Sequence, residues 1–464
     1  GPQGFQVANS CRFNDGSSDY MLKTASAGNR RTFTFSTWLK LSQLTTARNL
    51  FTSWSANNDA GFTYLAITDG DKIKFSGYGT TYLETTQLLR DSSSWYHLML
   101  AVDTTSGTAN NRCRIYLNGS EITSFGTRNN PSQNADLAYN QNSVDLVLSS
   151  NNYGGSKGNY YDGYLAETVW IDGTQYAASD FGEFNSQTGI WVPKVVTGLT
   201  FGTNGFYLNY QDSAELGTDA NGGTALAETN LTSLDQSTDT CSTNFATLNP
   251  LVYTVNAPVY SNGNNTIVGN SSGNGSTQIS TIGSSSGKFY VEVKCVAYSN
   301  SSGAAVGVVE AGEWSADSLS IASDSYFYGT SSGYGYKISN GNKVNNSTGG
   351  SAYGASYTTG DIIGIALDLD NNKLYFSKNG VWQNSGDPTS GATGTGSAFT
   401  LSSGTYNFTS YIYYNTFSFA WNFGSPSFAI SSGNADSNGF GNFEYAVPTG
   451  FLSLNTKNLT TVLA

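Results

Sequence analysis

The chain has 464 residues, of which 38% are hydrophobic and 14% aromatic, so it holds enough apolar side chains to fold. Its 33 acidic and 21 basic residues give a net charge of -12, which repels nucleic-acid phosphates and anionic lipid surfaces. No apolar run reaches the roughly 18 residues that a membrane-spanning helix needs. Composition and charge therefore argue against nucleic acid as a partner and against membrane insertion.

The length exceeds the roughly 250–300 residues at which a single hydrophobic core stops growing, which predicts two domains. The 53 glycines and the frequent Asn, Ser and Thr are turn formers that disfavour helix interiors. The sequence therefore predicts an all-β protein with two antiparallel β-sandwich domains of the jelly-roll type in tandem.

Strand patterns begin early in the chain. Residues 33–41 alternate apolar and polar, which predicts a half-buried strand. Its apolar face would carry Phe33, Phe35, Leu39 and Leu41. Residues 95–102 are apolar on both faces, as expected in the middle of a covered sheet. Residues 112–117 run into Asn118-Gly119, a strong hairpin signal because both turn positions need positive φ.

A change in composition marks the boundary between the two domains. Aromatic residues become sparse between positions 210 and 249, where small polar residues prevail, as in a connector. Strands of the second domain are expected at residues 288–296, 361–369, 373–376 and 417–423. The predicted organisation is a sandwich at 1–210, a connector at 211–248, a second sandwich at 249–430, and a C-terminal extension at 431–464 that packs on the second domain.

The four cysteines are too few for a disulfide scaffold in a chain of this length. Cys11, Cys113 and Cys295 each alternate with apolar neighbours, as buried free thiols do. We therefore expect four reduced cysteines and assembly in a reducing cytoplasm.

Four segments of the first half together resemble a known domain. They are TFTFSTWLKL (32–41), SSWYHLMLAVD (93–103), RIYLNGSEI (114–122) and DGYLAETVWIDG (162–173). Their order and spacing are similar to those of laminin-G or pentraxin-type concanavalin-like domains, over roughly the first 200 residues. The resemblance implies a sandwich of two sheets that serves binding.

The second half resembles a SPRY domain. The similarity lies in SGKFYVEV (286–293), in GDIIGIALDLDNNKLYFSKNGVW (360–382) and in the strand that ends with WNFG (421–424). The tandem order, with GPQGFQVANSCRFND (1–15) at one end and VPTGFLSLNTKNL (447–459) near the other, is similar to virion structural proteins of marine and cyanobacterial phages. That resemblance implies a place on the virion surface.

The sequence carries few residues suited to catalysis. His97 is the single histidine and lies inside an apolar strand, which argues against Ser/His/Asp catalysis and against a site with several histidines. Glycan-cleaving enzymes need two carboxylates about 5 Å apart when they retain configuration. Glu167 instead stands among Leu165, Val169 and Ile171, which are expected to point inward with it. We therefore expect no enzyme activity.

The laminin-G and pentraxin resemblance also implies Ca²⁺ bound by loop carboxylates. Candidate oxygen ligands are Asp15, Asp19, Asp69 and Asp71. They do not form a spaced acidic loop, and Asp is common in turns without any metal. The sequence therefore predicts no metal site and no cofactor.

Aromatic residues in predicted loops are the remaining candidates for ligand binding, because flat rings with polar edges suit sugars and protein interfaces. They are Trp54, Tyr78, Tyr82, Tyr153, Tyr160 and Tyr161 in the first domain, and Trp314, Tyr326, Tyr328, Tyr334, Tyr336 and Trp382 in the second. The alternative is that these rings pack inside their own sandwich or against a neighbouring subunit.

The lead hypothesis is a bacteriophage virion surface protein, a decoration or fibre component, that binds a host-surface glycan or protein. It would contact other virion proteins and form a homo-oligomer, a trimer by analogy with phage fibres. The excess of aromatic residues, including Tyr411, Tyr413 and Tyr414, motivates this oligomer. The alternatives are a purely structural assembly protein and, third, a polysaccharide-degrading enzyme.

Overall fold

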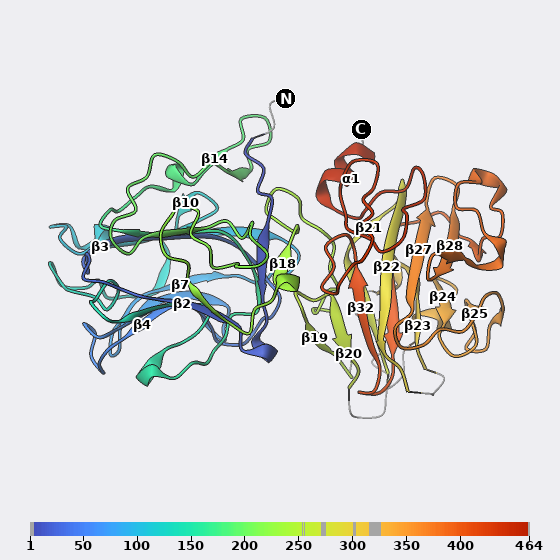
Figure 1. Ribbon diagram of the computed structural model, residues 1–464, viewed down its shortest axis with the longest axis horizontal. Coiled ribbons are helices and arrows are strands. Elements are labelled where there is room, and N and C mark those ends of the chain that lie inside the picture. The colour runs from blue at the N-terminus through green and yellow to red at the C-terminus, as the bar shows by residue number, and fades with distance from the viewer. Residues whose placement is uncertain are drawn as a thin grey trace. The chain divides into compact units, whose positions relative to one another are not determined.

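The computed structural model describes residues 4–252, 254, 256–270, 275–299, 303–314 and 326–462. The chain divides into two compact units, Gly1–Thr243 and Asn244–Ala464, and each is built around two β-sheets (Figure 1). The strand pairs of these sheets are antiparallel, and α1 (Thr456–Val462) is the one α-helix among the described residues. The all-β, two-sandwich prediction is confirmed.

One sheet of the first unit, here the β3 sheet, has the order β10-β9-β8-β3-β13-β1-β18, with β16 beside β13. Its strands are β1 (Ser10–Phe13), β3 (Thr32–Leu41), β8 (Trp95–Asp103), β9 (Cys113–Leu117), β10 (Ser120–Glu121), β13 (Gly163–Asp172), β16 (Phe206–Leu208) and β18 (Gln236–Ser237). Asn118 and Gly119 join β9 to β10 with φ of 49° and 80°, as the hairpin signal predicted.

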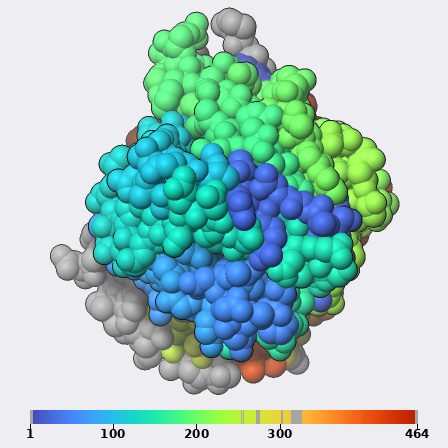
Figure 2. Space-filling view, turned by 90° about the vertical axis from the view of Figure 1, so that its left-hand side faces the viewer, coloured from blue at the N-terminus to red at the C-terminus, as the bar shows by residue number. Residues whose placement is uncertain are grey.

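The other sheet of the first unit, here the β5 sheet, has the order β11-β7-β6-β5-β4-β12-β2-β17. Its strands are β2 (Tyr20–Thr24), β4 (Arg48–Trp54), β5 (Phe62–Ile67), β6 (Lys72–Ser76), β7 (Thr81–Leu88), β11 (Phe125–Arg128), β12 (Asp145–Leu148) and β17 (Ala227–Thr229). A separate hairpin pairs β14 (Gly182–Phe184) with β15 (Trp191–Pro193). Figure 2 turns the first unit toward the viewer, with its blue, cyan and green segments at the surface.

The second unit has a β22 sheet in the order β19-β20-β32-β22-β27-β28-β29, with β30 beside β28, and a β23 sheet in the order β21-β31-β23-β24-β25-β26. The strands of the β22 sheet are β19 (Val259–Ser261), β20 (Thr266–Val268), β22 (Lys288–Ala297), β27 (Ile362–Asp368), β28 (Lys373–Lys378), β29 (Val381–Trp382), β30 (Phe399–Thr400) and β32 (Ser418–Asn422). Those of the β23 sheet are β21 (Ser276–Ser284), β23 (Ala305–Glu310), β24 (Gly333–Lys337), β25 (Asn342–Val344), β26 (Ser351–Ala352) and β31 (Tyr406–Ile412).

Short 3-10 helices connect many of these strands. They are η1 (Asp15–Ser17), η2 (Ala109–Asn111), η3 (Tyr153–Gly155), η4 (Ala178–Asp180), η5 (Ser233–Asp235), η6 (Ala311–Trp314), η7 (Phe327–Gly329), η8 (Gln383–Ser385) and η9 (Gly391–Thr393).

The core of the first unit lies between its two sheets and follows the predicted alternation. The predicted apolar face of β3 lies in this core, with Phe33, Phe35, Leu39 and Leu41 fully buried. Strand β8 is covered on both faces: Leu98 and Leu100 face this core, whereas Met99 and Ala101 belong to a second cluster with Trp38 and Trp191. The prediction for residues 95–102 is therefore confirmed.

The prediction that Glu167 points inward with Leu165, Val169 and Ile171 is wrong, because β13 contains a bulge. The register of β13 against β3 shifts between Ala166 and Val169, and Glu167 has a φ of 48°. Leu165 therefore faces the core between the sheets, whereas Val169 and Ile171 join the cluster on the opposite face. One extra residue in a strand reverses the side-chain alternation beyond it.

The core of the second unit is also sandwiched between two sheets, with Phe289, Val291, Val293 and Cys295 of β22 pointing into it. The opposite face of β22 is covered by the C-terminal segment, whose Phe443 and Phe451 pack with Tyr290 and Tyr375. The buried carboxylate of Glu292 accepts hydrogen bonds from the backbone N–H of Glu444 (2.8 Å) and Tyr445 (3.0 Å). Residues 443–445 are thereby fixed on the β22 sheet.

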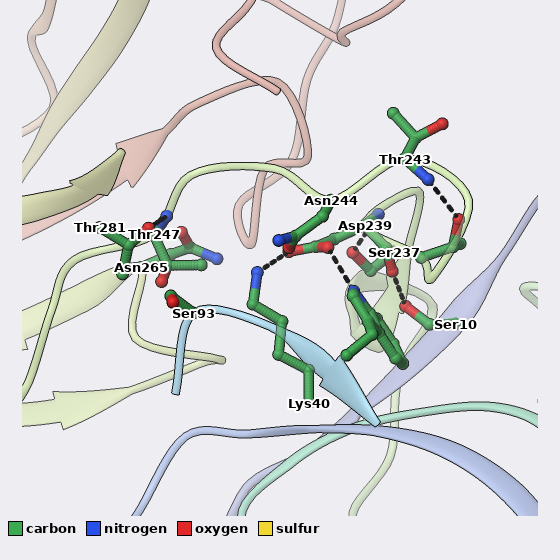
Figure 3. Close-up of polar contacts among 12 residues, drawn as sticks. Ser10, Lys40, Ser93, Ser237, Asp239, Thr243, Asn244, Thr247, Asn265 and Thr281 are labelled. Atoms are coloured by element: carbon green, nitrogen blue, oxygen red, sulfur yellow. Dashed lines mark hydrogen bonds and ion pairs between the residues drawn. The ribbon is translucent and has the colours of Figure 1, made fainter. Parts of the chain in front are cut away.

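The segment 211–248, expected as a connector, is largely part of the first unit, which extends to Thr243. It supplies β17, which pairs with β2, and β18, which pairs with β1. Next to β18, the Asp239 carboxylate forms a 2.8 Å ion pair with the Lys40 ammonium group. Both side chains are almost fully buried (Figure 3). These edge strands are too short for an alternating pattern to show in the sequence.

All four cysteines are free in the structure. Cys11, Cys113 and Cys295 are buried, and Cys241 is half-buried. Among the described residues, no helix is long and apolar enough to cross a membrane.

Candidate functional site

A groove lies on the outer face of the β5 sheet, over its middle strands β4, β5 and β6. Directly opposed residues in an antiparallel pair share a face, so the outward side of this region can be read from the register. Ala66 is opposed by Lys74 on β6 and by Asn49 on β4, while Leu65 and Phe75 point into the core. Alternation therefore places Tyr64 and Phe62 on the outer face beside Ala66.

The loop between β12 and β13 forms one wall of the groove. It is attached to β4 by a hydrogen bond from the Asn49 N–H to the Asn159 carbonyl (2.7 Å). Within the loop, the Asn151 side-chain oxygen accepts from the backbone N–H of Asn152 (2.8 Å) and Tyr153 (3.1 Å). Gly154 follows with a φ of 63°, a conformation that glycine adopts readily. Tyr153 is thus held at the rim.

The groove has a volume of about 350 Å³. Its lining combines rings, amides and two opposite charges. The rings are Phe62, Tyr64 and Tyr153, the amides are Asn49, Asn151 and Asn159, and the charged residues are Lys74 and Asp69. Aromatic rings stack on the C–H faces of sugars, and amides offer both donors and acceptors to hydroxyl groups.

The rings form a continuous cluster that extends beyond the groove. The centroid of Phe62 lies 5.1 Å from that of Tyr64 and 5.5 Å from that of Tyr153. Tyr78 stacks on Tyr153, with centroids 6.1 Å apart and ring planes 12° apart. Tyr78 is 48% exposed and Tyr153 is 41% exposed, so their rings are available to a ligand. The Tyr78 hydroxyl raises the pKa of Tyr153.

The loop that carries Tyr78 is also ordered by local contacts. The Asp59 carboxylate accepts hydrogen bonds from the Gly79 N–H (2.8 Å) and the Thr80 hydroxyl (2.6 Å). Two independently braced loops therefore present parallel tyrosine rings at the rim.

Comparison with known proteins finds one domain match in each half of the chain. Residues 15–177 match the model of the concanavalin A-like lectin/glucanases superfamily, and residues 288–405 match that of the SPRY domain. The chain carries a concanavalin A-like domain and a SPRY domain. A segment of 48 residues is 44% identical to the Ran-binding proteins 9/10 homolog of Drosophila melanogaster; it spans 10% of this chain and 5% of that protein.

Two solved structures have low similarity to parts of the chain. The SPRY domain of human HERC1 is 19% identical, with a TM-score of 0.27, and the match covers 38% of this chain and 96% of that one. A heptameric SAP-like pentraxin from Limulus polyphemus is 11% identical, with a TM-score of 0.28, over 38% of this chain and 80% of that one.

Of the predicted aromatic residues in the concanavalin A-like domain, the structure brings Tyr78 and Tyr153 together. Trp54 is half-buried opposite Phe62 on the same face, and its indole N–H donates to Asn57 (3.0 Å). Tyr160 is half-buried and stacks on Tyr20 at 6.4 Å.

The predictions for Tyr82 and Tyr161 as ligand-binding residues are wrong, because both rings are buried in the core. The Tyr161 hydroxyl donates inside the domain, to the Lys40 and Tyr164 carbonyls at 3.0 Å each. Phe62 and Tyr64 were missed. The signal that could have found them is the alternating pattern FTYLAI at residues 62–67. It places the rings of Phe62 and Tyr64 on one face of the strand, and Leu65 and Ile67 on the opposite face.

In the SPRY domain, the predictions for Tyr328, Tyr334 and Tyr336 are also wrong, because all three are buried. Tyr326 is half-buried with its ring 4.6 Å from that of Tyr411. Trp382 is half-buried and packs beside Tyr290 at 6.3 Å, and the side chain of Trp314 lies outside the described residues. Tyr326 and Tyr328 lie together, with ring centroids 5.2 Å apart, but Tyr328 is buried. Among the described residues, these candidates therefore form no exposed pair of rings in the SPRY domain.

His97 is buried and contacts a potential nucleophile without forming a catalytic pair. Its Nδ1 accepts from the Trp191 indole N–H (3.0 Å), so its Nε2 carries the proton and donates to the Ser36 hydroxyl (2.7 Å). Burial lowers the pKa of His97 to about 3. A histidine held in this tautomer cannot take a proton from Ser36 at neutral pH.

The candidate Ca²⁺ ligands lie in two regions. Asp15 and Asp19 interact electrostatically with each other, whereas Asp69 and Asp71 lie in the turn between β5 and β6. Asp71 is buried and paired with Arg48 (2.7 Å), and Asp69 lies in the groove. The Asp19 carboxylate accepts from the Asn14 N–H (2.9 Å), and burial raises its pKa to about 6. Among the described residues, no group of three or more His, Cys, Asp or Glu side chains could hold a metal ion.

Proposed function

We propose that the protein binds carbohydrate in the groove on the β5 sheet of its concanavalin A-like domain. The observation that carries this proposal is the pair of exposed, parallel rings of Tyr78 and Tyr153 beside three asparagine amides. Rings recognise the apolar face of a sugar, and amides pair with its hydroxyl groups.

The size of the groove suits a short stretch of glycan. Its volume of about 350 Å³ is near the lower end of the 300–1,000 Å³ usual for ligand sites. The rings continue past the groove to Tyr78, so a chain of sugars has a surface on which to extend.

We propose that this binding occurs without bond cleavage. Asp69 is the one carboxylate that lines the groove within the described residues. Glycosidases of the usual kind need two, a proton donor and a nucleophile or base. Incubation with host polysaccharides should release no reducing sugar, and measurable release would overturn this part of the proposal.

The binding site is tested with the full-length chain on a glycan array, followed by calorimetry of the best ligand. Tyr153→Ala removes a rim ring and should weaken binding about twofold to tenfold, since stacking of a ring contributes roughly 0.5–1.5 kcal/mol. Leu234→Ala, which shortens a side chain that is 41% exposed in the same domain outside the groove, is the control and should leave affinity unchanged. Equal affinity of the Tyr153 variant would contradict the site, and absence of any glycan ligand would favour a purely structural protein.

We further propose a location on the surface of a bacteriophage particle, as a decoration or fibre component. The tandem order of the two domains and the terminal segments at 1–15 and 447–459 support it, because they resemble virion proteins of marine and cyanobacterial phages. Antibodies against the chain should label purified particles in electron micrographs. Absence of the chain from the purified particles would overturn the proposal.

A homo-oligomer is part of this proposal. Tyr411 and Ile412 are buried, so the predicted surface of aromatic residues is reduced to Tyr413 and Tyr414. Other large apolar side chains are exposed singly, which is common on a protein surface and does not by itself indicate an interface. They include Phe184, Ile190, Val259 and Val381. Light scattering should give a multiple of 49.3 kDa, three times that mass for a trimer, whereas a monomer at micromolar concentration would contradict it.

A further inference from the structure

Two opposite charges occupy different parts of the groove. Lys74 lies on β6, directly opposite Ala66 of β5 and Glu84 of β7. Asp69 is exposed and follows the end of β5 at Ile67. Because β5 runs from the rings of Phe62 and Tyr64 toward Asp69, the positive charge lies beside the rings and the negative charge lies at the far end.

The ammonium group of Lys74 leans toward the groove. Its Nζ lies 5.8 Å from the centre of the Tyr64 ring. The neighbouring acid, Glu84, instead forms an ion pair with Lys72 at 3.8 Å. Within the described residues, no Asp or Glu oxygen lies within 4.0 Å of the Lys74 Nζ. An ammonium over a ring and beside a cavity keeps its donors available for an incoming anion.

We propose that the glycan carries an anionic group, a carboxylate or a sulfate, which Lys74 binds next to Tyr64. This inference rests on the proposed carbohydrate site and adds the charge and the orientation of its ligand. Asp69 repels a second anionic group from the far end, so the charged sugar binds over the rings.

The charge of the whole chain makes this contact specific. With a net charge of -12, the protein repels anionic polymers at long range. Adsorption without a defined site is therefore disfavoured, and an acidic glycan needs a local cation. Lys74 is half-buried, so salt screens its contact less than that of a fully exposed lysine.

The experiment compares matched ligands by calorimetry with the full-length chain. One pair is a uronic acid oligosaccharide and its carboxyl-reduced derivative, and the other is a sulfated oligosaccharide and its desulfated derivative. The pair with the larger affinity ratio identifies the anionic group. The wild type should prefer one anionic ligand over its neutral partner by about tenfold, the effect of a hydrogen bond to a charged group.

Three variants assign the effect to the groove. Lys74→Gln should lose about tenfold for the anionic ligand and nothing for the neutral one, and its binding should depend less on salt. Asp69→Asn removes the repelling charge and should tighten anionic binding about twofold to threefold. Lys194→Gln changes the charge by the same amount at an exposed residue of the same domain outside the groove, and should have no effect.

The outcomes separate this inference from the proposal on which it rests. An anionic preference that Lys74→Gln leaves unchanged, or an equal loss for both ligands of a pair, would overturn the role of Lys74. If Tyr153→Ala still weakens binding in that case, the carbohydrate site stands without a role for Lys74. If the wild type binds neither pair and no other glycan, the carbohydrate site and this inference both fail.

Discussion

Glu167 occupies an unusual position for a carboxylate. Its residue is 6% exposed, its backbone has a φ of 48° at the bulge of β13, and its Oε2 accepts from the Tyr207 hydroxyl. Burial raises the pKa of Glu167 to about 7, although the Tyr207 hydrogen bond acts in the opposite direction. The folded protein therefore favours the neutral carboxyl group, and the unfolded chain favours the carboxylate above its ordinary pKa of 4.5.

This difference predicts that stability falls as pH rises from about 4.5 to 7. Above pH 7, ionisation of Glu167 should cost the folded state roughly 3 kcal/mol, and below pH 4.5 nothing. Glu167→Gln cannot ionise, so urea unfolding at pH 5 to 8 should show the variant gaining stability relative to the wild type. Glu183→Gln, at an exposed residue, is the control. A stability difference that does not change with pH would contradict the prediction.

Single tyrosines also show how much of the candidate carbohydrate site could be predicted from the sequence. The sequence predicts Tyr78 and Tyr153 as binding residues because they are flat rings with polar edges in predicted loops. The same argument selects Tyr161 and Tyr336, which are buried. A buried tyrosine is stable when its hydroxyl finds a partner, and the Tyr336 hydroxyl donates to the Ala355 carbonyl. Such partners come from segments distant in the fold, so the sequence gives no sign of them.

At the scale of elements, the C-terminal segment covers the outer face of the β22 sheet, which carries apolar side chains. Its rings Phe443 and Phe451 pack on Tyr290 and Tyr375 of the β22 sheet. Glu292 fixes the segment, since its carboxylate accepts from two backbone N–H groups and from the Tyr290 hydroxyl (2.9 Å). The sequence revealed the strands by their apolar period, but residues 431–464 have no period.

Glu292→Gln should destabilise the SPRY domain by about 2–3 kcal/mol, because an amide NH₂ would face a backbone N–H that needs an acceptor. Hydrogen exchange should show faster exchange of the Glu444 and Tyr445 amides, while the core amides of β27 change less. Glu310→Gln in the same domain is a half-buried control. Unchanged exchange at residues 444 and 445 would mean that Glu292 does not hold the segment.

On the scale of the whole molecule, the two units have separate cores, so each should fold from its own fragment. The predicted boundary at residue 210 is too early, because strands of two or three residues need only backbone hydrogen bonds and leave no apolar pattern. Lys40 shows what a domain ending at that boundary would lose. Its buried ammonium pairs with Asp239, which a chain ending at residue 210 lacks.

Fragment 1–243 should therefore unfold in urea as a stable domain. Fragment 1–210 should be less stable by at least about 3–5 kcal/mol, the usual cost of leaving one partner of a buried ion pair alone. Circular dichroism checks that fragment 1–243 keeps its β-structure. Equal unfolding midpoints for the two fragments would show that β17, β18 and Asp239 contribute no stability.

The contacts of His97 should be visible in a magnetic resonance spectrum. As the single histidine, it gives one pair of imidazole nitrogen signals in a ¹⁵N magnetic resonance spectrum. While the Trp191 indole donates its hydrogen bond to Nδ1, these signals should be those of the neutral ring with the proton on Nε2. They should stay constant down to about pH 3. If the β14–β15 hairpin detaches, Nδ1 loses its donor and the ring can titrate near its ordinary pKa. His97 is thus an intrinsic reporter of whether this hairpin is docked, without any added label.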